Sequence, residues 1–312
     1  MENLLLSLEV VLPLFLMLAL GYFLRRIQLV EDGSLRVMNN LVFRVFLPVL
    51  LFINIYRTDI GAVMNPRLIL FAASCVAGSF LLLFFLVPIF EKDNRRRGVL
   101  VQGIFRSNFI LFGLPVTIAL CGEENSGVTS MVIAVIIPLF NILAVFALEY
   151  FRGGKFRPDR VLRGIATNPL IIASLSGVLV LSLGWKLPSI IEKTAEDIAG
   201  VATPLALVVL GGSFEFSSVR GRRRQVLAGV FGRLVAVPAV CLPIAAALGF
   251  RGPELVTLMA LLASPTAVSS FTMAQQMDGD AELAGQLVVF GSLFSILTIF
   301  LWTFLLKQLG LI

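Results

Sequence analysis

Long apolar stretches, rather than the short alternating patterns of soluble proteins, dominate this chain. Ten such stretches of about 20 residues follow one another, separated by short turns that are charged or rich in glycine and proline. They cover residues 4–24, 37–56, 67–90, 98–121, 127–151, 161–183, 199–215, 225–248, 254–277 and 283–306. Because about 20 apolar residues of helix span a bilayer, the pattern predicts an all-α polytopic membrane protein with ten transmembrane helices.

The first and seventh stretches depart from the regular pattern. The run 4–24 is longer than the apolar part of a secretory signal and has neither a basic segment before it nor a small-residue cleavage site after it. We therefore expect it to remain as the first span. The stretch 199–215 is short, and an amphipathic lead-in to its helix would account for the charged residues before it, which are Glu192, Lys193, Glu196 and Asp197.

Composition agrees with a bilayer environment. Hydrophobic residues make up 58% of the 312 residues and charged residues 14%, against about a quarter charged in soluble domains. The chain has no histidine, its three cysteines are isolated from one another, and it has no GxxxxGK[ST] phosphate-binding loop. We therefore expect no enzyme, no metal site and no cofactor. The net charge of +6 is assigned to loops rather than to nucleic-acid binding.

Basic residues are distributed unevenly over the loops. Loops after the odd-numbered stretches hold 16 lysines and arginines, whereas the opposite side, with both termini, holds 6. Positive residues accumulate on the cytoplasmic side of a membrane, so the odd loops are predicted to lie inside and both termini outside. The three remaining arginines, Arg44, Arg106 and Arg233, lie within apolar stretches.

A weak internal repeat relates the two halves of the chain. Shifting the sequence by 156 or 155 residues aligns Pro13 with Pro169, Gly21 with Gly177, Pro48 with Pro204 and Pro88 with Pro243. Residues 1–156 and 157–312 are therefore predicted to form two repeats of five spans. Because five is odd, the second repeat would enter the membrane inverted, as in many secondary transporters.

Two stretches at equivalent places of this repeat, 98–121 and 254–277, are polar and prone to breaking near their middle. A helix broken inside a membrane exposes N–H groups and a partial positive charge at the start of its second half, and both suit an anion. Such residues also occur in unbroken membrane helices, so the argument depends on the equivalence of the two segments. The candidate substrate-binding residues are Asn108, Gly113, Pro115, Ser264, Pro265, Thr266, Ser269 and Ser270.

Arg106 lies two residues before Asn108 and is a further candidate. It could attract an anion from the cytoplasmic side, or its side chain could extend to the membrane interface. Arg44 and Arg233 have no broken helix beside them in the sequence, and for both we expect extension to the interface.

Other polar groups receive structural interpretations. Asn141 and Gln286 are expected to form hydrogen bonds between helices. The segment Asp278–Gly279–Asp280 lacks the further ligands of a calcium loop and predicts a turn and a helix cap.

Four segments resemble the bacterial branch of the auxin efflux carrier family. They are NPLIIASLSG from Asn168, ATPLALVVLGGSF from Ala202, FGLP from Phe112 and SPTAVSSFTMAQQMDGD from Ser264. The resemblance implies a scaffold of spans 1, 2, 6 and 7 and a transport unit of spans 3–5 and 8–10, in which broken spans 4 and 9 cross beside the substrate. It also implies elevator-type alternating access, carboxylates such as malate, malonate or auxin-like anions as substrates, and a homodimer.

The chain departs from the plant members of that family in two places. Plant carriers have a proline where this chain has Ser270, and their long cytoplasmic insertion is reduced here to residues 151–160. Auxin itself is therefore a poor candidate.

The resulting hypothesis is a secondary transporter of a small organic anion in a bacterial inner membrane. Its partners would be the substrate, the lipid bilayer and a second copy of the chain. Alternatives are an anion channel with a continuous polar pathway and a cation-coupled symporter of the related bile-acid-symporter-like fold. An intramembrane enzyme would need paired carboxylates, a nucleophile with a base, or metal ligands at membrane depth, and the apolar stretches contain no such set.

Overall fold

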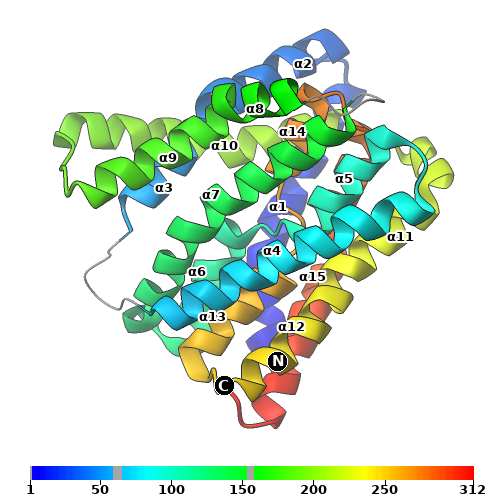
Figure 1. Ribbon diagram of the computed structural model, residues 1–312. Coiled ribbons are helices and arrows are strands. Elements are labelled where there is room, and N and C mark those ends of the chain that lie inside the picture. The colour runs from blue at the N-terminus through cyan, green and yellow to red at the C-terminus, as the bar shows by residue number, and fades with distance from the viewer. Residues whose placement is uncertain (1, 59–64, 153–157) are drawn as a thin grey trace.

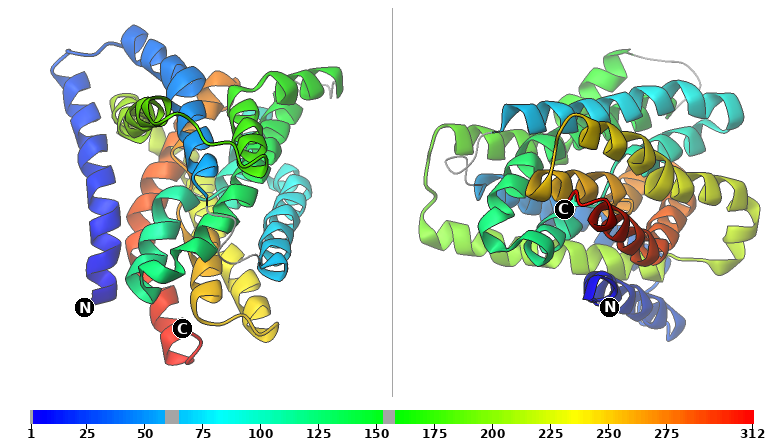
Figure 2. Two further views of the ribbon diagram at one scale, coloured as in Figure 1. Left: turned by 90° about the vertical axis from the view of Figure 1, so that its left-hand side faces the viewer. Right: turned by 90° about the horizontal axis from the view of Figure 1, so that it is seen from below.

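The computed structural model describes residues 2–58, 65–152 and 158–312. Within these ranges the regular structure is helical, apart from one antiparallel bridge between Ser107 and Thr266. Figure 1 shows the helices packed in a bundle with both termini at its lower end, and Figure 2 confirms this arrangement from two further directions. Termini at one end of the bundle agree with an even number of crossings.

The described residues up to Arg152 form seven α-helices. Helix α2 continues through a π-helical turn, Val42–Phe46, into α3. The break between α5 and α6 is at Arg106–Asn108. The helices are α1 (Glu2–Arg26), α2 (Asp32–Leu41), α3 (Leu47–Tyr56), α4 (Pro66–Phe90), α5 (Asn94–Phe105), α6 (Phe109–Cys121) and α7 (Ser126–Phe151).

The second half has a similar succession of helices. A 3-10 turn, Phe216–Arg222, precedes α11, and a π-helical turn, Gly232–Ala236, joins α11 to α12. The break between α13 and α14 covers residues 264–268. The helices are α8 (Pro158–Thr167), α9 (Pro169–Ser182), α10 (Ser189–Gly212), α11 (Arg223–Phe231), α12 (Val237–Ala247), α13 (Gly252–Ala263), α14 (Ser269–Gln276) and α15 (Ala281–Gln308).

The prediction of a helical membrane protein with several crossings is confirmed. Six helical segments of the described chain are long and apolar enough to cross a membrane, and the bent pair α8–α9 would make a seventh. Helices α6 and α13 are apolar but shorter. All ten predicted stretches overlap helices, and the full number of ten crossings remains a prediction. Helix α10 begins at Ser189, so it includes the charged lead-in expected before residue 199.

Local sequence signals explain where several helices begin. Asn65 and Asn168 each cap a helix whose first residue is proline, and each side chain accepts a backbone N–H of the first turn. Asp280 caps α15 in the same way by accepting from Leu283. Helices α8 and α9 meet at Asn168 with a bend of 55°, although residues 161–183 form one continuous apolar stretch in the sequence.

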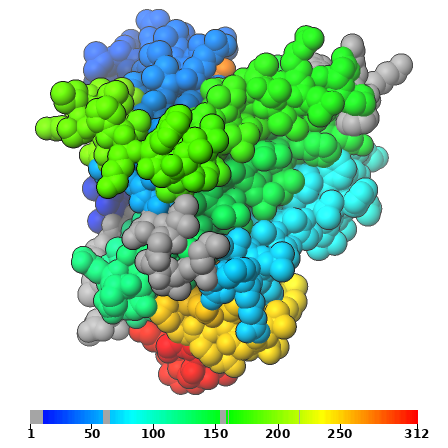
Figure 3. Space-filling view, turned by 60° about the vertical axis from the view of Figure 1, so that its left-hand side comes forward, coloured from blue at the N-terminus to red at the C-terminus, as the bar shows by residue number. Residues whose placement is uncertain are grey.

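Two helix pairs form one side of the molecule. Helix α1 packs along α10, and α3 packs along α9. Figure 3 shows the surface of α8–α9 beside that of α2–α3, and the surface of α4 beside that of α12–α13. Large apolar side chains such as Leu82, Phe85 and Ile89 of α4 point outward, as expected of a surface that faces lipid.

Candidate functional site

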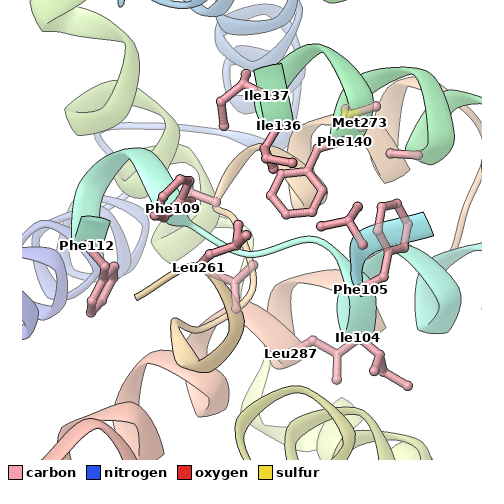
Figure 4. Close-up of a cluster of buried hydrophobic side chains, with 14 of the residues drawn as sticks. Ile104, Phe105, Phe109, Phe112, Ile136, Ile137, Phe140, Leu261, Met273 and Leu287 are labelled. Carbon is pink, nitrogen blue, oxygen red and sulfur yellow. The ribbon is translucent and has the colours of Figure 1, made fainter. Parts of the chain in front are cut away.

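The two broken helices cross each other in the middle of the molecule. The extended segment after α5 runs antiparallel to the segment after α13, and the Asn108 N–H donates to the Pro265 carbonyl at 2.7 Å. Figure 4 shows this extended chain between Phe105 and Phe109, with Ile136, Ile137 and Phe140 of α7 beside it. The crossing was predicted from the family resemblance, and the backbone geometry agrees with it.

A small cavity of about 50 Å³ borders the crossing, below the size of typical small-molecule sites, so it has room for a small polar group rather than for a whole substrate. One wall consists of the crossing residues Arg106–Asn108, the first turn of α6 and the residues Ala267–Ser269 at the start of α14. The opposite wall is apolar except for one threonine. It consists of Leu47, Leu50 and Leu51 of α3, Leu170 of α9, and Thr203 and Ala206 of α10.

The N-terminal ends of two helices therefore meet at one cavity. The first N–H groups of a helix have no partner within it, and the helix dipole places a partial positive charge there. Phe109, Ile110 and Leu111 of α6 line the cavity together with Ser269 of α14. Both ends favour a negative charge in the cavity.

Arg106 adds a full positive charge to this wall. Its side chain is buried, and it donates to the Asn141 Oδ1 atom at 2.7 Å and to the Met273 sulfur. Two of its five N–H donors thus have acceptors among the described residues, which leaves donors of the guanidinium fork for a bound carboxylate. The alternative that Arg106 extends to the membrane interface is wrong for this structure.

Two neighbours of Arg106 carry buried polar atoms without a partner among the described residues. They are the hydroxyl of Ser107 and the side-chain nitrogen of Asn108. Both residues are more than nine-tenths buried and line the cavity. Since an unsatisfied buried donor costs about 1–3 kcal/mol, these groups indicate a place where a polar ligand completes the hydrogen bonding.

Asn141 of α7 connects Arg106 to the helix pair on the far side of the cavity. Its side-chain nitrogen donates to the Ser174 hydroxyl of α9 at 3.1 Å, and Ser174 donates to the Leu170 carbonyl at 2.7 Å. The predicted interhelical role of Asn141 is confirmed. Its proximity to Arg106 could not be read from the sequence, because 35 residues separate the two.

The remaining candidates take structural positions around the crossing. Thr266 donates to the Gly103 carbonyl, and Ser264 donates to the Ala260 carbonyl. Ser270 lies in α14, and its carbonyl accepts from the Gln102 amide. Of the candidate residues, Arg106, Asn108 and Ser269 line the cavity, whereas Gly113, Pro115, Ser264, Pro265, Thr266 and Ser270 do not.

The sequence placed the first break near Asn108, where the structure has it, but two of the residues expected beside it take no part in the break. Gly113 and Pro115 were expected near the interruption, but both lie within α6, and the chain breaks at Arg106–Asn108. Among the helices that the structure describes, five others contain an internal proline, so proline alone does not break these helices. Gly113 instead allows close packing, because a β-carbon there would press on the Phe109 ring.

The prediction that the Arg233 side chain extends to the membrane interface is also wrong. This side chain is 1% exposed and lies beneath the crossing. Arg44 is exposed, as expected. Within the described residues, no group of three acidic or cysteine side chains is placed to hold a metal ion.

Similarity to known proteins gives the family. The model of the family described as "Membrane transport protein" matches residues 6–303 of this chain. The chain belongs to the auxin efflux carrier family of membrane transporters. The family and the relatives are named as membrane transporters, and the apolar helices of this chain agree with a multi-pass membrane protein.

Three relatives show the range of the family. An uncharacterized transporter of Methanocaldococcus jannaschii is 23% identical over 96% of this chain and 98% of its own length. A protein of Rhizobium meliloti named "Putative malonate transporter" is 24% identical over 93% of this chain and 92% of its own length. A rice protein named "Probable auxin efflux carrier component 5c" is 28% identical over 42% of this chain and 37% of its own length.

Proposed function

We propose that this family member carries a small carboxylate across a bacterial inner membrane. The observation that carries the proposal is the convergence, on one cavity, of two helix N-terminal ends, the Arg106 guanidinium and the unpartnered polar atoms of Ser107 and Asn108. The substrate carboxylate would accept from these donors, and its carbon chain would face the leucines of α3. The name of the Rhizobium meliloti relative makes malonate the first substrate to test.

The proposed movement is an elevator-type alternating access. The cavity lies between the helices α3, α9 and α10 on one side and the crossing helices with α7 on the other, so its two walls belong to the proposed scaffold and transport unit. The polar groups lie on the crossing side, where they could travel with the substrate. The facing wall of leucine side chains offers a surface over which the transport unit could slide.

Glycine packing supports the proposed inverted repeat. A β-carbon at Gly21 of α1 would collide with the Val208 carbonyl of α10, and one at Gly177 of α9 would come within 3.1 Å of the Phe52 carbonyl of α3. Gly177 lies 156 positions after Gly21, and Val208 lies 156 positions after Phe52. The two close contacts are therefore equivalent under the predicted repeat, with the roles of the two halves exchanged.

Proteoliposome uptake of labelled malonate, with other mono- and dicarboxylates as competitors, tests the function. A carrier predicts saturable uptake and counterflow, in which unlabelled malonate inside accelerates entry of the label. Uncoupled currents of millions of ions per second would instead identify an anion channel. Absence of uptake and of competition across the whole carboxylate set would contradict the substrate class.

Two variants test the site in the same assay. Asn108→Ala and Pro265→Ala are expected to lower malonate uptake, since the first removes a cavity donor and the second relaxes the strand segment that holds Asn108. Neither is expected to lower the amount of folded protein in the membrane. Arg44→Ala, which changes an exposed arginine at similar predicted depth, is the matched control. Unchanged uptake in both site variants would contradict the assignment.

A further inference from the structure

Arg233 is a buried cation whose partners are backbone carbonyls. It lies in the π-helical turn Gly232–Ala236, and all five of its N–H donors have acceptors within the crossing. Nε donates to the Ser264 carbonyl at 2.8 Å. The two terminal nitrogens donate to the carbonyls of Ile104 at 3.1 Å, Phe105 at 3.0 Å, Leu261 at 2.7 Å and Leu262 at 2.6 Å.

These carbonyls are the unpaired C-terminal ends of the two broken helices. The last four carbonyls of a helix have no partner within it. In α5, the Gln102 carbonyl accepts from the Arg106 N–H and the Gly103 carbonyl accepts from Thr266. Arg233 donates to the remaining two carbonyls, those of Ile104 and Phe105. In α13, Arg233 donates to the carbonyls of Leu261 and Leu262. One side chain therefore binds the C-terminal ends of both broken helices.

The charges also balance. Each helix C-terminus carries about half a negative elementary charge, so two ends together present about one, which the guanidinium neutralises. Arg233 forms no ion pair with a carboxylate in the part of the chain that the structure describes. In other transporters with broken helices, the half-helix C-terminal ends and unwound carbonyls coordinate a coupling Na⁺ or proton.

We propose that Arg233 is a built-in cation at the crossing, which fills the carbonyl cage that a coupling Na⁺ would otherwise use. The positive charge is covalently attached, so it neutralises the helix ends both with and without substrate. Transport then needs no alkali cation at this site. Because the fixed charge returns with the empty carrier, the net charge moved in each cycle is that of the substrate alone.

Removing the side chain should create a cation site selective for guanidinium. The first test uses the purified full-length protein in detergent and needs no substrate. Thermal unfolding of Arg233→Ala is measured with low-millimolar guanidinium chloride and, at equal ionic strength, with sodium or potassium chloride. We expect the melting temperature to fall by about 5 °C or more and guanidinium to restore at least half of the loss.

Matched controls separate this effect from general salt effects. Wild-type protein and Arg44→Ala should not gain stability from guanidinium, because neither has an empty carbonyl cage. Equal responses of Arg233→Ala and wild type, or an unchanged melting temperature in Arg233→Ala, would overturn the proposal. If Arg233→Ala does not fold, Arg233→Lys keeps the charge with fewer donors. Arg233→Lys should fold with a lowered melting temperature, and wild-type stability in Arg233→Lys would overturn the proposal equally.

A second test measures cation dependence and also depends on the proposed function. Wild-type malonate uptake is compared in sodium, potassium and choline media of equal ionic strength. Equal initial rates are expected, and a requirement for sodium would overturn the proposal. If malonate is not transported in any medium, the substrate assignment fails while the guanidinium rescue still decides the role of Arg233.

Discussion

The two sides of the helix crossing bury one arginine each, but the two arginines are used differently. All five N–H groups of Arg233 donate to backbone carbonyls at the C-terminal ends of α5 and α13. Arg106 has one strong acceptor, the Asn141 side chain, and a weak one in Met273, and it faces a cavity. The arginine at the helix C-terminal ends therefore has no donor to spare, whereas the arginine beside the helix N-terminal ends keeps free donors.

This difference indicates which side of the crossing is structural and which binds. A buried group whose hydrogen bonds are all satisfied fixes the backbone around it. Unsatisfied donors beside two helix N-terminal ends favour a ligand that supplies negative charge. Substitutions on the Arg233 side should therefore change stability first, and substitutions on the Arg106 side should change substrate binding first.

The largest expected effect separates the two arginines directly. Arg106→Gln should weaken malonate binding by about 2–3 kcal/mol, or roughly 30-fold or more in the concentration for half-maximal uptake, because it removes a charged hydrogen-bond donor from a buried site. Its melting temperature should stay near that of wild type. Concentration-dependent uptake in proteoliposomes, with thermal unfolding in detergent, measures both quantities.

Arg233→Gln is the comparison variant for this prediction. It should lower the melting temperature and the amount of folded protein more than it changes the affinity of the protein that remains. Equal affinity losses in Arg106→Gln and Arg233→Gln would mean that the two sides of the crossing do not have separate roles.

A smaller effect is expected from the residue that orients Arg106. Asn141→Ala removes the oxygen that accepts from Arg106 at 2.7 Å and frees Ser174 on α9. We expect a loss of affinity for malonate of about 1–1.5 kcal/mol, close to tenfold, since Arg106 keeps its charge but loses its fixed orientation. Asn141→Asp should instead reduce uptake more strongly, because a carboxylate at this place would pair with Arg106 and repel the substrate. If Asn141→Asp improves uptake, the substrate is not an anion bound at Arg106.

The contrast between the arginines also explains how much could be predicted from the sequence. The apolar stretches gave the helices, and the polar residues near Asn108 and Pro265 gave the two interruptions, because both signals are local. The partners of Arg233 lie 28 to 129 residues away in sequence, so its depth in an apolar stretch suggested the membrane interface instead. Likewise, Gly113 and Pro115 lie inside α6, because antiparallel pairing with Pro265 and Thr266, rather than proline, fixes the break.

The smallest expected effect tests whether ion pairs stabilise the crossing helices at their predicted cytoplasmic end. Asp280, the cap of α15, pairs with Arg96 in the first turn of α5 and with Arg222 before α11. Burial opposes ionisation of this carboxyl, but hydrogen bonds from Arg222, the Leu283 N–H and Arg96 hold its pKa below the ordinary value of 3.8. A lowered pKa stabilises the folded state above that value, and this contribution is lost as the pH falls through the folded-state pKa.

Asp280→Asn should therefore reduce stability at pH 7 by less than about 1 kcal/mol, since the site is partly open to solvent. The difference in melting temperature between this variant and wild type should shrink as the pH falls below 3.8. Asp278→Asn, whose carboxylate is largely exposed beside Arg152, should have a smaller effect and is the matched control. The Arg233 contacts involve backbone carbonyls and do not titrate, so the Arg233→Lys difference should persist over the same pH range. A pH-independent deficit in Asp280→Asn would show that this end of the crossing is held by the cap geometry rather than by the ion pairs.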